Sequence, residues 1–206
     1  MKPSQAFHLD QLRIVAARPA LNFVNTVDPR EGEPGVEYIP TYSALVQWAV
    51  RVGIITRSQS EHLKRAAQPD RSQEQQALRR ALTLREALYR ALSALSKHRQ
   101  PHHRDLGVIQ SAFHEAVGQA QLKQRGHRFQ WQLREDLDLI SSLIALDTVE
   151  LLESGLADRL RRCPGSGDCG WLFVDTSKNA TRRWCSMAGC GNRAKARRHS
   201  RKMRRS

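Results

Sequence analysis

All four cysteines of the 206-residue chain lie in one short segment, between Cys163 and Cys190. They form two close pairs, because five residues separate Cys163 from Cys169 and four separate Cys185 from Cys190, with fifteen residues between the pairs. Each pair can supply two thiolates from one tight turn, and the segment between the pairs is long enough to fold back. The spacing therefore predicts one structural zinc ion held by all four cysteines.

Disulfide bonds are the alternative to zinc for such a cluster. The polar start "MKPSQAFHLD" has no apolar core of the kind found in export signals, and a reducing cytoplasm disfavours disulfides. A catalytic zinc ion would need an open position for water, which four thiolates do not leave. We therefore expect a soluble cytoplasmic protein with one Zn²⁺ in a structural role.

The segments around the cysteines predict the form of this zinc site. The stretch "GWLFVDTSKNATRRW" contains an apolar run, a polar turn and a second run, which is typical of a β-hairpin. After Cys190, Gly191 and Asn192 offer a turn and a helix cap, and "RAKARRHSRKMRR" can continue as a helix. A cysteine turn, a hairpin and a helix in that order predict a treble-clef-like zinc finger with a basic C-terminal helix.

The positive charge of the chain is concentrated at this end. Residues 161–206 hold 13 of the 34 Lys and Arg residues but 2 of the 20 Asp and Glu residues, so they carry +11 of the formal net charge of +14. No acidic residue follows Asp175. Such a block repels itself unless it is extended in solvent or laid on a polyanion, which makes nucleic acid the expected partner.

A regular spacing of arginines predicts how the basic helix would bind nucleic acid. Arg193, Arg197, Arg201 and Arg205 recur at every fourth position and would share one helix face. Residues at the start of such a helix, Asn192 and Arg193, are best placed to reach base edges. The predicted nucleic-acid-binding residues are Arg182, Arg183, Asn192, Arg193, Lys195, Arg197, Arg198, Arg201 and Lys202.

Both DNA and RNA are candidates for the bound nucleic acid. Readers of single-stranded RNA usually carry several stacking aromatic residues, whereas the chain after Trp184 has no Phe, Trp or Tyr. This favours duplex DNA. Trp184 itself is expected to pack under the finger, with stacking on a base as the alternative.

The first 160 residues predict a mainly helical fold with a few short strands. Helix starts are expected at Pro19, at Thr41, at Thr56 with Gln59 and at Asp70 with Gln73, because a proline in the first turn or a capping side chain stands at each. The longest helix is expected over residues 71–98, and others over 106–122 and 135–154. The short alternating segment "RFQWQL" predicts a strand, whose partner is expected near "LRIV" or in another segment. We expect two domains, residues 1–158 and 159–206.

The helical region carries no recognisable catalytic motif, so we expect no enzyme. Asn22, Asn25 and Thr26 are polar residues in an apolar segment, and buried polar groups need partners. They are expected either to cap neighbouring helices or to line a small-molecule effector pocket. His98, His102 and His103 are interpreted as a solvated helix end, with a second metal site as the alternative.

The segment "CPGSGDCGWLFVDTSKNATRRWCSMAGCGNRAKARRH" resembles the CGNR zinc finger, whose name is the tetrapeptide that begins at Cys190. The segments "ALNFVNTV" and "LREALYRAL" are similar to the ABATE domain, from a bacterial family named for stress-induced transcription regulation. The resemblance implies a zinc-dependent DNA-binding regulator whose N-terminal domain senses an effector or mediates association, for example as a homodimer. The alternative is an RNA- or ribosome-associated protein that uses the same finger.

Overall fold

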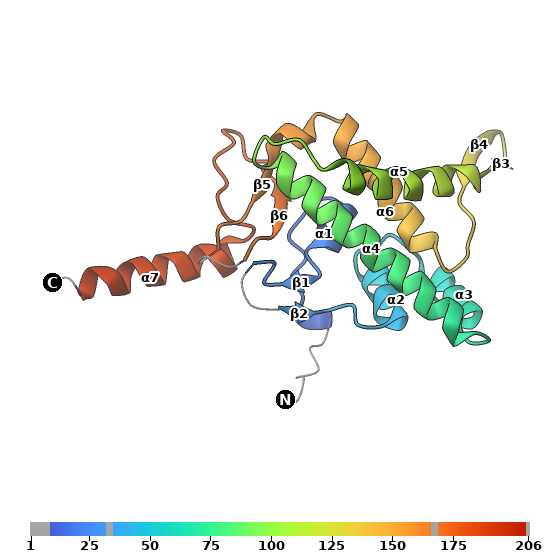
Figure 1. Ribbon diagram of the computed structural model, residues 1–206, viewed down its shortest axis with the longest axis horizontal. Coiled ribbons are helices and arrows are strands. Elements are labelled where there is room, and N and C mark those ends of the chain that lie inside the picture. Colours follow the sequence, from blue (N-terminus) through green and yellow to red (C-terminus); the bar gives the residue numbers. More distant parts are fainter. Residues whose placement is uncertain (1–8, 32–34, 166–168, 205–206) are drawn as a thin grey trace.

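The computed structural model describes residues 9–31, 35–165 and 169–204, and this part of the chain is mainly helical (Figure 1). Its α-helices are α1 (Pro19–Val24), α2 (Tyr42–Arg51), α3 (Arg57–Ala67), α4 (Arg71–Leu95), α5 (His103–Gly118), α6 (Leu139–Glu153) and α7 (Asn192–Met203). Antiparallel strand pairs are formed by β1 (Val27–Asp28) with β2 (Val36–Glu37), β3 (Gln121–Arg125) with β4 (Arg128–Gln132), and β5 (Leu160–Arg162) with β6 (Leu172–Val174). Shorter helical turns are η1 (Leu9–Gln11), η2 (Leu156–Arg159) and the π-helical turn η3 (Met187–Gly191). The predicted fold class, mainly α with a few short strands, is confirmed.

Helix α4 is the element against which most of the chain packs. Its apolar side chains recur at helical spacing, so that Ala81, Leu84, Leu88 and Leu92 are buried on one side. The helix contacts α1, α2, α3, α5, α6, β5 and β6, and it runs through the middle of the molecule (Figure 1). Within the described ranges, no helix has both the length and the apolar character that a bilayer span requires.

The helix starts predicted from capping residues are confirmed. The Thr41 hydroxyl accepts from the Ala44 N–H, and Thr56 with Gln59 forms a reciprocal capping box. The Asp70 carboxylate accepts from two backbone N–H groups in the first turn of α4. These short-range bonds depend on two or three neighbouring residues, which is why the sequence predicts them well.

Helices α4 and α6 each have one boundary that differs from the expected one. Helix α4 ends at Leu95 instead of residue 98, and His98 has a left-handed φ of 54° that no helix can contain. Helix α6 begins at Leu139 instead of residue 135, because Asp136 accepts from the Asp138 N–H in a turn before the helix. Both errors concern one helical turn and leave the arrangement of the helices unchanged.

The strand predicted at "RFQWQL" is β4, but the predicted extension of the preceding helix to Leu122 is wrong. Helix α5 ends at Gly118, and β3 then pairs with β4 across a turn in which Gly126 has φ of 61°. The left-handed conformation suits glycine, so the two strands can reverse within two residues. The partner of β4 is therefore β3, the segment directly before it, and not a segment near "LRIV".

The hairpin predicted between the two cysteine pairs is also wrong. Its first apolar run is β6, which pairs with β5 ahead of the first cysteine. The second run forms no strand, and one of its backbone N–H groups, that of Arg182, bonds to the buried Asp175 carboxylate instead. One carboxylate oxygen accepts from the Ser177 N–H at 2.9 Å and the other from the Arg182 N–H at 2.9 Å.

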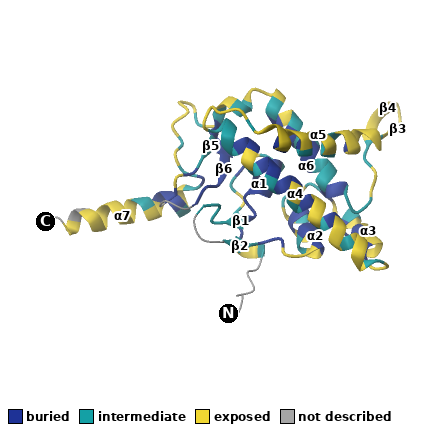
Figure 2. Cartoon of the chain, viewed as in Figure 1, coloured by how far each residue is buried: buried dark blue, intermediate teal, exposed yellow. Residues whose placement is uncertain are grey.

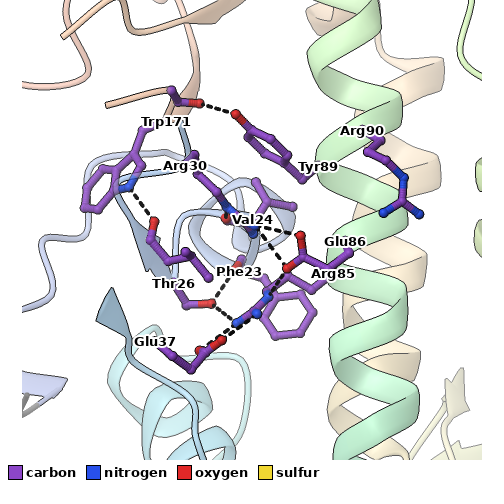
Figure 3. Close-up of polar contacts among 12 residues, drawn as sticks. Phe23, Val24, Thr26, Arg30, Glu37, Arg85, Glu86, Tyr89, Arg90 and Trp171 are labelled. Carbon is purple, nitrogen blue, oxygen red and sulfur yellow. Dashed lines mark hydrogen bonds and ion pairs between the residues drawn. The ribbon is translucent and has the colours of Figure 1, made fainter. Parts of the chain in front are cut away.

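A network of partly buried ion pairs joins α4 to the β1–β2 region (Figure 3). Arg85 donates to both carboxylate oxygens of Glu37, at 2.8 and 2.6 Å, and to the Glu86 carboxylate at 2.8 Å. Arg30 donates to both carboxylate oxygens of Glu86, at 3.0 and 2.8 Å, and its guanidinium carbon lies 4.4 Å from the centre of the Tyr89 ring. Only 4% and 5% of the Arg30 and Arg85 side chains are exposed, so both cations depend on these carboxylates.

The pKa of Glu86 reflects this environment. Partial burial raises it, but the charges of Arg30 and Arg85 outweigh burial and hold the pKa below its ordinary value of 4.5. A carboxylate with a lowered pKa stabilises the folded state above its ordinary pKa, and this contribution is lost as the pH falls through the lowered value.

We expect the substitution Glu86→Gln to destabilise the protein by about 3 kcal/mol at neutral pH, because it leaves the buried Arg30 cation without its carboxylate. Urea denaturation measures the change in the free energy of unfolding. The stability of the wild type should fall as the pH drops below 4.5, because Glu86 takes up a proton and its ion pairs are lost. The variant has no carboxylate at this position, so its stability should fall less over the same pH range. Glu61→Gln is the matched control, because Glu61 forms an exposed pair with Lys64 and its loss should change the stability far less than the loss of Glu86. Equal stability of the two variants would contradict the structural role of the network.

Side chains of the helical region hold the segment that follows the second cysteine. The Asn25 amide pairs with both backbone groups of Leu172, donating to its carbonyl at 2.8 Å and accepting from its N–H at 2.9 Å. The Trp171 indole N–H donates to the Val27 carbonyl at 2.9 Å. The side chain of Asn25 thus provides the hydrogen bonds that a neighbouring strand would give to β6.

Two more contacts reach the second cysteine and the residue after it. The Arg30 N–H donates to the Cys169 carbonyl at 3.0 Å, and the Tyr89 hydroxyl donates to the Gly170 carbonyl at 3.1 Å. Gly170 has φ of 65°, and a Cβ there would lie 2.9 Å from the Tyr89 hydroxyl oxygen, so only glycine fits. The cysteine-rich end is therefore bonded to α1, to β1 and its following loop, and to α4.

The domain boundary at residue 158 stays a prediction, and a fragment of residues 1–158 tests it. We expect the fragment to unfold cooperatively, because most of the buried apolar core, from Leu12 to Leu151, lies within it. It should melt about 5 °C below the whole chain, since the buried Asn25 amide loses both partners. Circular dichroism on heating measures both, and a gradual, non-cooperative melt would contradict the boundary.

Candidate metal centre and nucleic-acid interface

The four cysteine sulfurs converge on one point. All four lie within 4.8 Å of one another, each residue is buried, and none takes part in a disulfide. The sulfur of Cys185 is 3.8 Å from that of Cys169 and 3.7 Å from that of Cys190. Within the described part of the chain, no other group of His, Cys, Asp and Glu side chains is arranged to hold a metal ion.

These distances fit a tetrahedral zinc site. Zinc–sulfur bonds of about 2.3 Å place two sulfurs of a tetrahedron about 3.8 Å apart, whereas a disulfide needs about 2.05 Å. The disulfide alternative is therefore wrong. Four cysteines fill the coordination of one Zn²⁺ and leave no open position, so the predicted structural zinc ion is confirmed in kind and in number.

The close approach of the four sulfurs couples their protonation. The pKa of Cys163 is lowered because the thiols of Cys169 and Cys185 donate to its sulfur. The pKa of Cys169 is raised, since its loss of a proton would remove a hydrogen bond to Cys163 and add negative charge beside it. A divalent cation allows all four sulfurs to be thiolates at once, and its binding releases protons.

The backbone shapes each cysteine turn. Cys163 follows β5, and its N–H donates to the Trp171 carbonyl at 2.8 Å. Gly165 has φ of 53°, and a Cβ there would lie 2.4 Å from the Cβ of Cys169, so the first turn requires glycine. Cys190 lies in η3, which is capped by Ser186, because the Ser186 hydroxyl accepts from the Gly189 N–H. Asn192, expected to cap the basic helix, is instead the first residue of α7.

Arg193, the last residue of the CGNR tetrapeptide, contacts the metal site. Its guanidinium donates to the Cys190 sulfur at 3.0 Å. Burial lowers the pKa of Arg193, but the negative charge of the Cys190 and Cys169 sulfurs outweighs burial and raises the pKa above its ordinary value. Four thiolates carry two more negative charges than one Zn²⁺ neutralises, so an arginine at this position stabilises the thiolate form. The prediction that Arg193 reads base edges stays a prediction, and the structure adds a bond to the metal site that the sequence did not indicate.

The two arginines before the third cysteine have different surroundings. The Arg182 guanidinium donates to the carbonyls of Trp184 and Cys185, at 3.1 and 2.5 Å, and lies over the Phe173 ring. Its donors therefore hold the loop that carries the third cysteine. Arg183 is exposed and lies against Trp184, which is partly buried and packs on the core as expected.

The remaining predicted cations lie on α7, which projects away from the rest of the molecule (Figures 1 and 2). Exposed residues of this helix from the predicted set are Asn192, Arg193, Lys195, Arg197, Arg198 and Arg201. The side chain of Lys202 and the whole of Arg205 lie outside the described residues. Lys195 and Arg198 share a hollow of about 300 Å³ with Arg183 and Trp184 at the base of the helix.

The three polar residues of α1 and its end are bonded within the protein. The Asn22 amide pairs with both backbone groups of Ala16, and Asn25 pairs with Leu172 as described above. The Thr26 hydroxyl donates to the Phe23 carbonyl and accepts from Arg85. None of these bonds caps a neighbouring helix as expected, because Asn22 bonds to a loop, Asn25 to β6, and Thr26 to the end of α1 and the Arg85 side chain. An effector pocket at these residues stays a prediction. A groove of about 690 Å³ lies elsewhere, between α4, α5 and α6.

The fold and the site together define a zinc-finger protein in which a larger helical domain is bonded to the finger. Residues 17–155 match the ABATE family, described as "Putative stress-induced transcription regulator", and residues 159–203 match the CGNR zinc finger. Because the first match spans more than half of the 206 residues, the chain belongs to this family. No curated protein matches the chain.

We expect Arg193→Ala to weaken zinc binding by about tenfold, because it removes the hydrogen bond and the positive charge at the Cys190 thiolate. Competition with a chromophoric chelator at fixed pH measures the affinity. Lys195→Ala removes the same charge from the same exposed helix and should bind zinc like the wild type. Arg193→Lys keeps the charge and should restore part of the affinity. Equal zinc affinities of the two alanine variants would contradict a role for Arg193 at the metal.

Proposed function

We propose that the protein is a DNA-binding transcription regulator whose zinc finger presents α7 to duplex DNA. The observation that carries the proposal is an exposed, wholly non-acidic helix that begins beside a zinc ligand and projects from the body (Figure 1). The zinc site fixes the position and direction of the first turn of α7. The family description as a transcription regulator supports the same function.

The dimensions and charge of α7 suit a DNA groove. Its 12 residues make a rod about 18 Å long and about 10–12 Å wide, and the major groove of B-DNA is about 12 Å wide. Arg193, Arg197 and Arg201 follow one another at every fourth position, so they lie along one side of the helix. Arg198 lies beside this row.

The hollow at the base of α7 suits a phosphate group. Arg183, Lys195 and Arg198 line it with positive charge, and the partly buried Trp184 lines it as well. Phosphate contacts of this kind set the position of a protein on the duplex, while the helix start reaches the bases. We therefore assign phosphate binding to these cations and base reading to Asn192. We leave Arg182 out, because its guanidinium bonds to carbonyls inside the finger.

The role proposed for the helical domain is to sense an effector or to mediate association. The groove between α4, α5 and α6 has the volume of a small-molecule site, which is usually about 300–1,000 Å³. Helix α4 forms one wall of this groove and also holds the finger through Tyr89. A ligand that shifts α4 would thus act on the finger directly.

A salt titration tests DNA binding. We expect the fourfold variant Arg197→Ala, Arg198→Ala, Arg201→Ala and Lys202→Ala to bind all duplexes more weakly than the wild type. The slope of log affinity against log salt should flatten by about 0.9 for each phosphate group that the variant no longer touches. Fluorescence anisotropy with labelled duplexes at two salt concentrations measures both, and zinc content checks that the finger is folded.

A second fourfold variant is the matched control. It replaces exposed cations of the helical domain and loses the same total charge, and its positions are Arg57, Arg65, Arg71 and Lys97. It should keep the wild-type affinity for duplex DNA and the wild-type slope of log affinity against log salt. Asn192→Ala should instead change the preference among duplex sequences. Tighter binding to a structured or single-stranded RNA than to genomic duplex fragments would favour the RNA-binding alternative.

A further inference from the structure

The β3–β4 hairpin exposes three large apolar side chains. Leu122, Phe129 and Trp131 are 54%, 63% and 70% exposed, and the hairpin lies at the end of the molecule remote from α7 (Figures 1 and 2). Apolar side chains scattered singly over a surface are ordinary, but a group of them within a single short hairpin is not. The arrangement of these three residues therefore needs an explanation.

The strand register places all three on one face of the hairpin. Leu122 is directly opposite Trp131, and Gln124 is opposite Phe129. Directly opposed residues and residues two apart in a strand share a face, so Leu122, Gln124, Phe129 and Trp131 form one surface. We call these four residues the apolar hairpin face. It carries no charged side chain.

The opposite face of the hairpin is polar and turns toward the body. Gln121, Lys123 and Gln132 line a cleft of about 290 Å³ together with His62 of α3. The cations Arg125 and Arg128 are paired with each other in the register on this same face. In a strand pair that packs on the protein core, the apolar face usually turns inward. In the β3–β4 hairpin the polar face turns toward the body, and the apolar face turns away from it.

The size of the apolar hairpin face is that of a functional patch. A buried Phe or Trp side chain covers about 150–250 Å², so two such rings at these exposures, with Leu122, leave roughly 350–400 Å² of apolar surface in water. Patches of about 300–600 Å² are the largest on typical monomers and often mediate binding.

We propose that the apolar hairpin face is a dimerisation surface, which packs against the same face of a second copy of this chain. An uncharged apolar surface is complementary to itself, and a two-fold axis can place Trp131 of each copy against Leu122 and Phe129 of the other. A nucleic acid or an anionic membrane would need cations beside the aromatic rings, and the hairpin's cations lie on its other face. Charge therefore favours the second copy.

The area of the face sets the strength of association. Two copies would bury roughly 700–800 Å² in total, whereas stable complexes bury about 1,200–2,000 Å². The dimer should accordingly be weak, with a dissociation constant in the micromolar range. Its position leaves both copies of α7 exposed, and it does not depend on whether α7 binds DNA.

Sedimentation velocity of nuclease-treated, zinc-loaded protein between about 1 and 200 μM tests this proposal. We expect the sedimentation coefficient of the wild type to rise with concentration. The tryptophan emission should shift to the blue over the same range, since Trp131 is the most exposed of the four tryptophans and would become buried. High salt should leave the association unchanged or strengthen it, because the face is uncharged.

The double variant Phe129→Ser and Trp131→Ser should raise the dissociation constant at least tenfold. Its melting temperature and zinc content should equal those of the wild type, because both side chains lie outside the core. Lys123→Ser, on the polar face, and Leu106→Ser, an exposed apolar position of α5, are matched controls that should dimerise like the wild type. If the double variant has a lower melting temperature than the wild type, Trp131→Arg serves in its place. This substitution places two like charges near the two-fold axis of the dimer, so repulsion should weaken the association.

Three results would overturn the proposal. The first is a wild type that stays monomeric throughout the concentration range. The second is self-association that persists in the hairpin variants, which would place the interface elsewhere. The third is a loss of nucleic-acid binding by these variants at concentrations where the wild type is monomeric, which would make the hairpin a platform for stacking bases.

Discussion

Crowding of four sulfur atoms around one point is the constraint on which the C-terminal part of the structure depends. The thiolates repel one another unless a cation lies between them, so the turns at Cys163 and Cys190 hold their shape only around a metal ion. The position of α7 follows, because Cys190 lies in the turn that leads directly into this helix. The Arg193 contact with the Cys190 sulfur links the first turn of the basic helix to the same charge balance.

The helical domain contributes to this centre from a distance along the chain. Its two segments that resemble the family, "ALNFVNTV" and "LREALYRAL", supply Asn25, Arg85, Glu86 and Tyr89. Asn25 and Tyr89 bond to the backbone next to the second cysteine, and Glu86 holds Arg30, whose N–H bonds to the carbonyl of that cysteine. Polar residues in these apolar segments therefore connect the helical region to the cysteine-rich end through hydrogen bonds.

The sequence predicts those features that depend on neighbouring residues or on strict chemistry. The caps at Thr41, Thr56 and Asp70 need two or three adjacent residues, and the zinc site needs four thiols at suitable spacing. Pairing between strands is harder, because a two-residue or three-residue strand has little pattern of its own. Two apolar runs predict the finger hairpin, but the second run is bound by one buried carboxylate, that of Asp175. The contacts of Asn25 and Arg193 could not be predicted, since they join residues whose approach depends on the finished fold.

The close approach of Tyr89 to Gly170 bears on how this kind of protein can change. The hydroxyl fills the space that a Cβ at position 170 would need, and the neighbouring carbonyl is held by the Arg30 N–H. In a finger taken from a relative with a larger residue at position 170, the Cβ of that residue would collide with the Tyr89 hydroxyl, and the finger would lose this contact with α4. Exchanging fingers between members of the family to obtain new binding preferences would therefore require residues 25, 89 and 170 to be exchanged together.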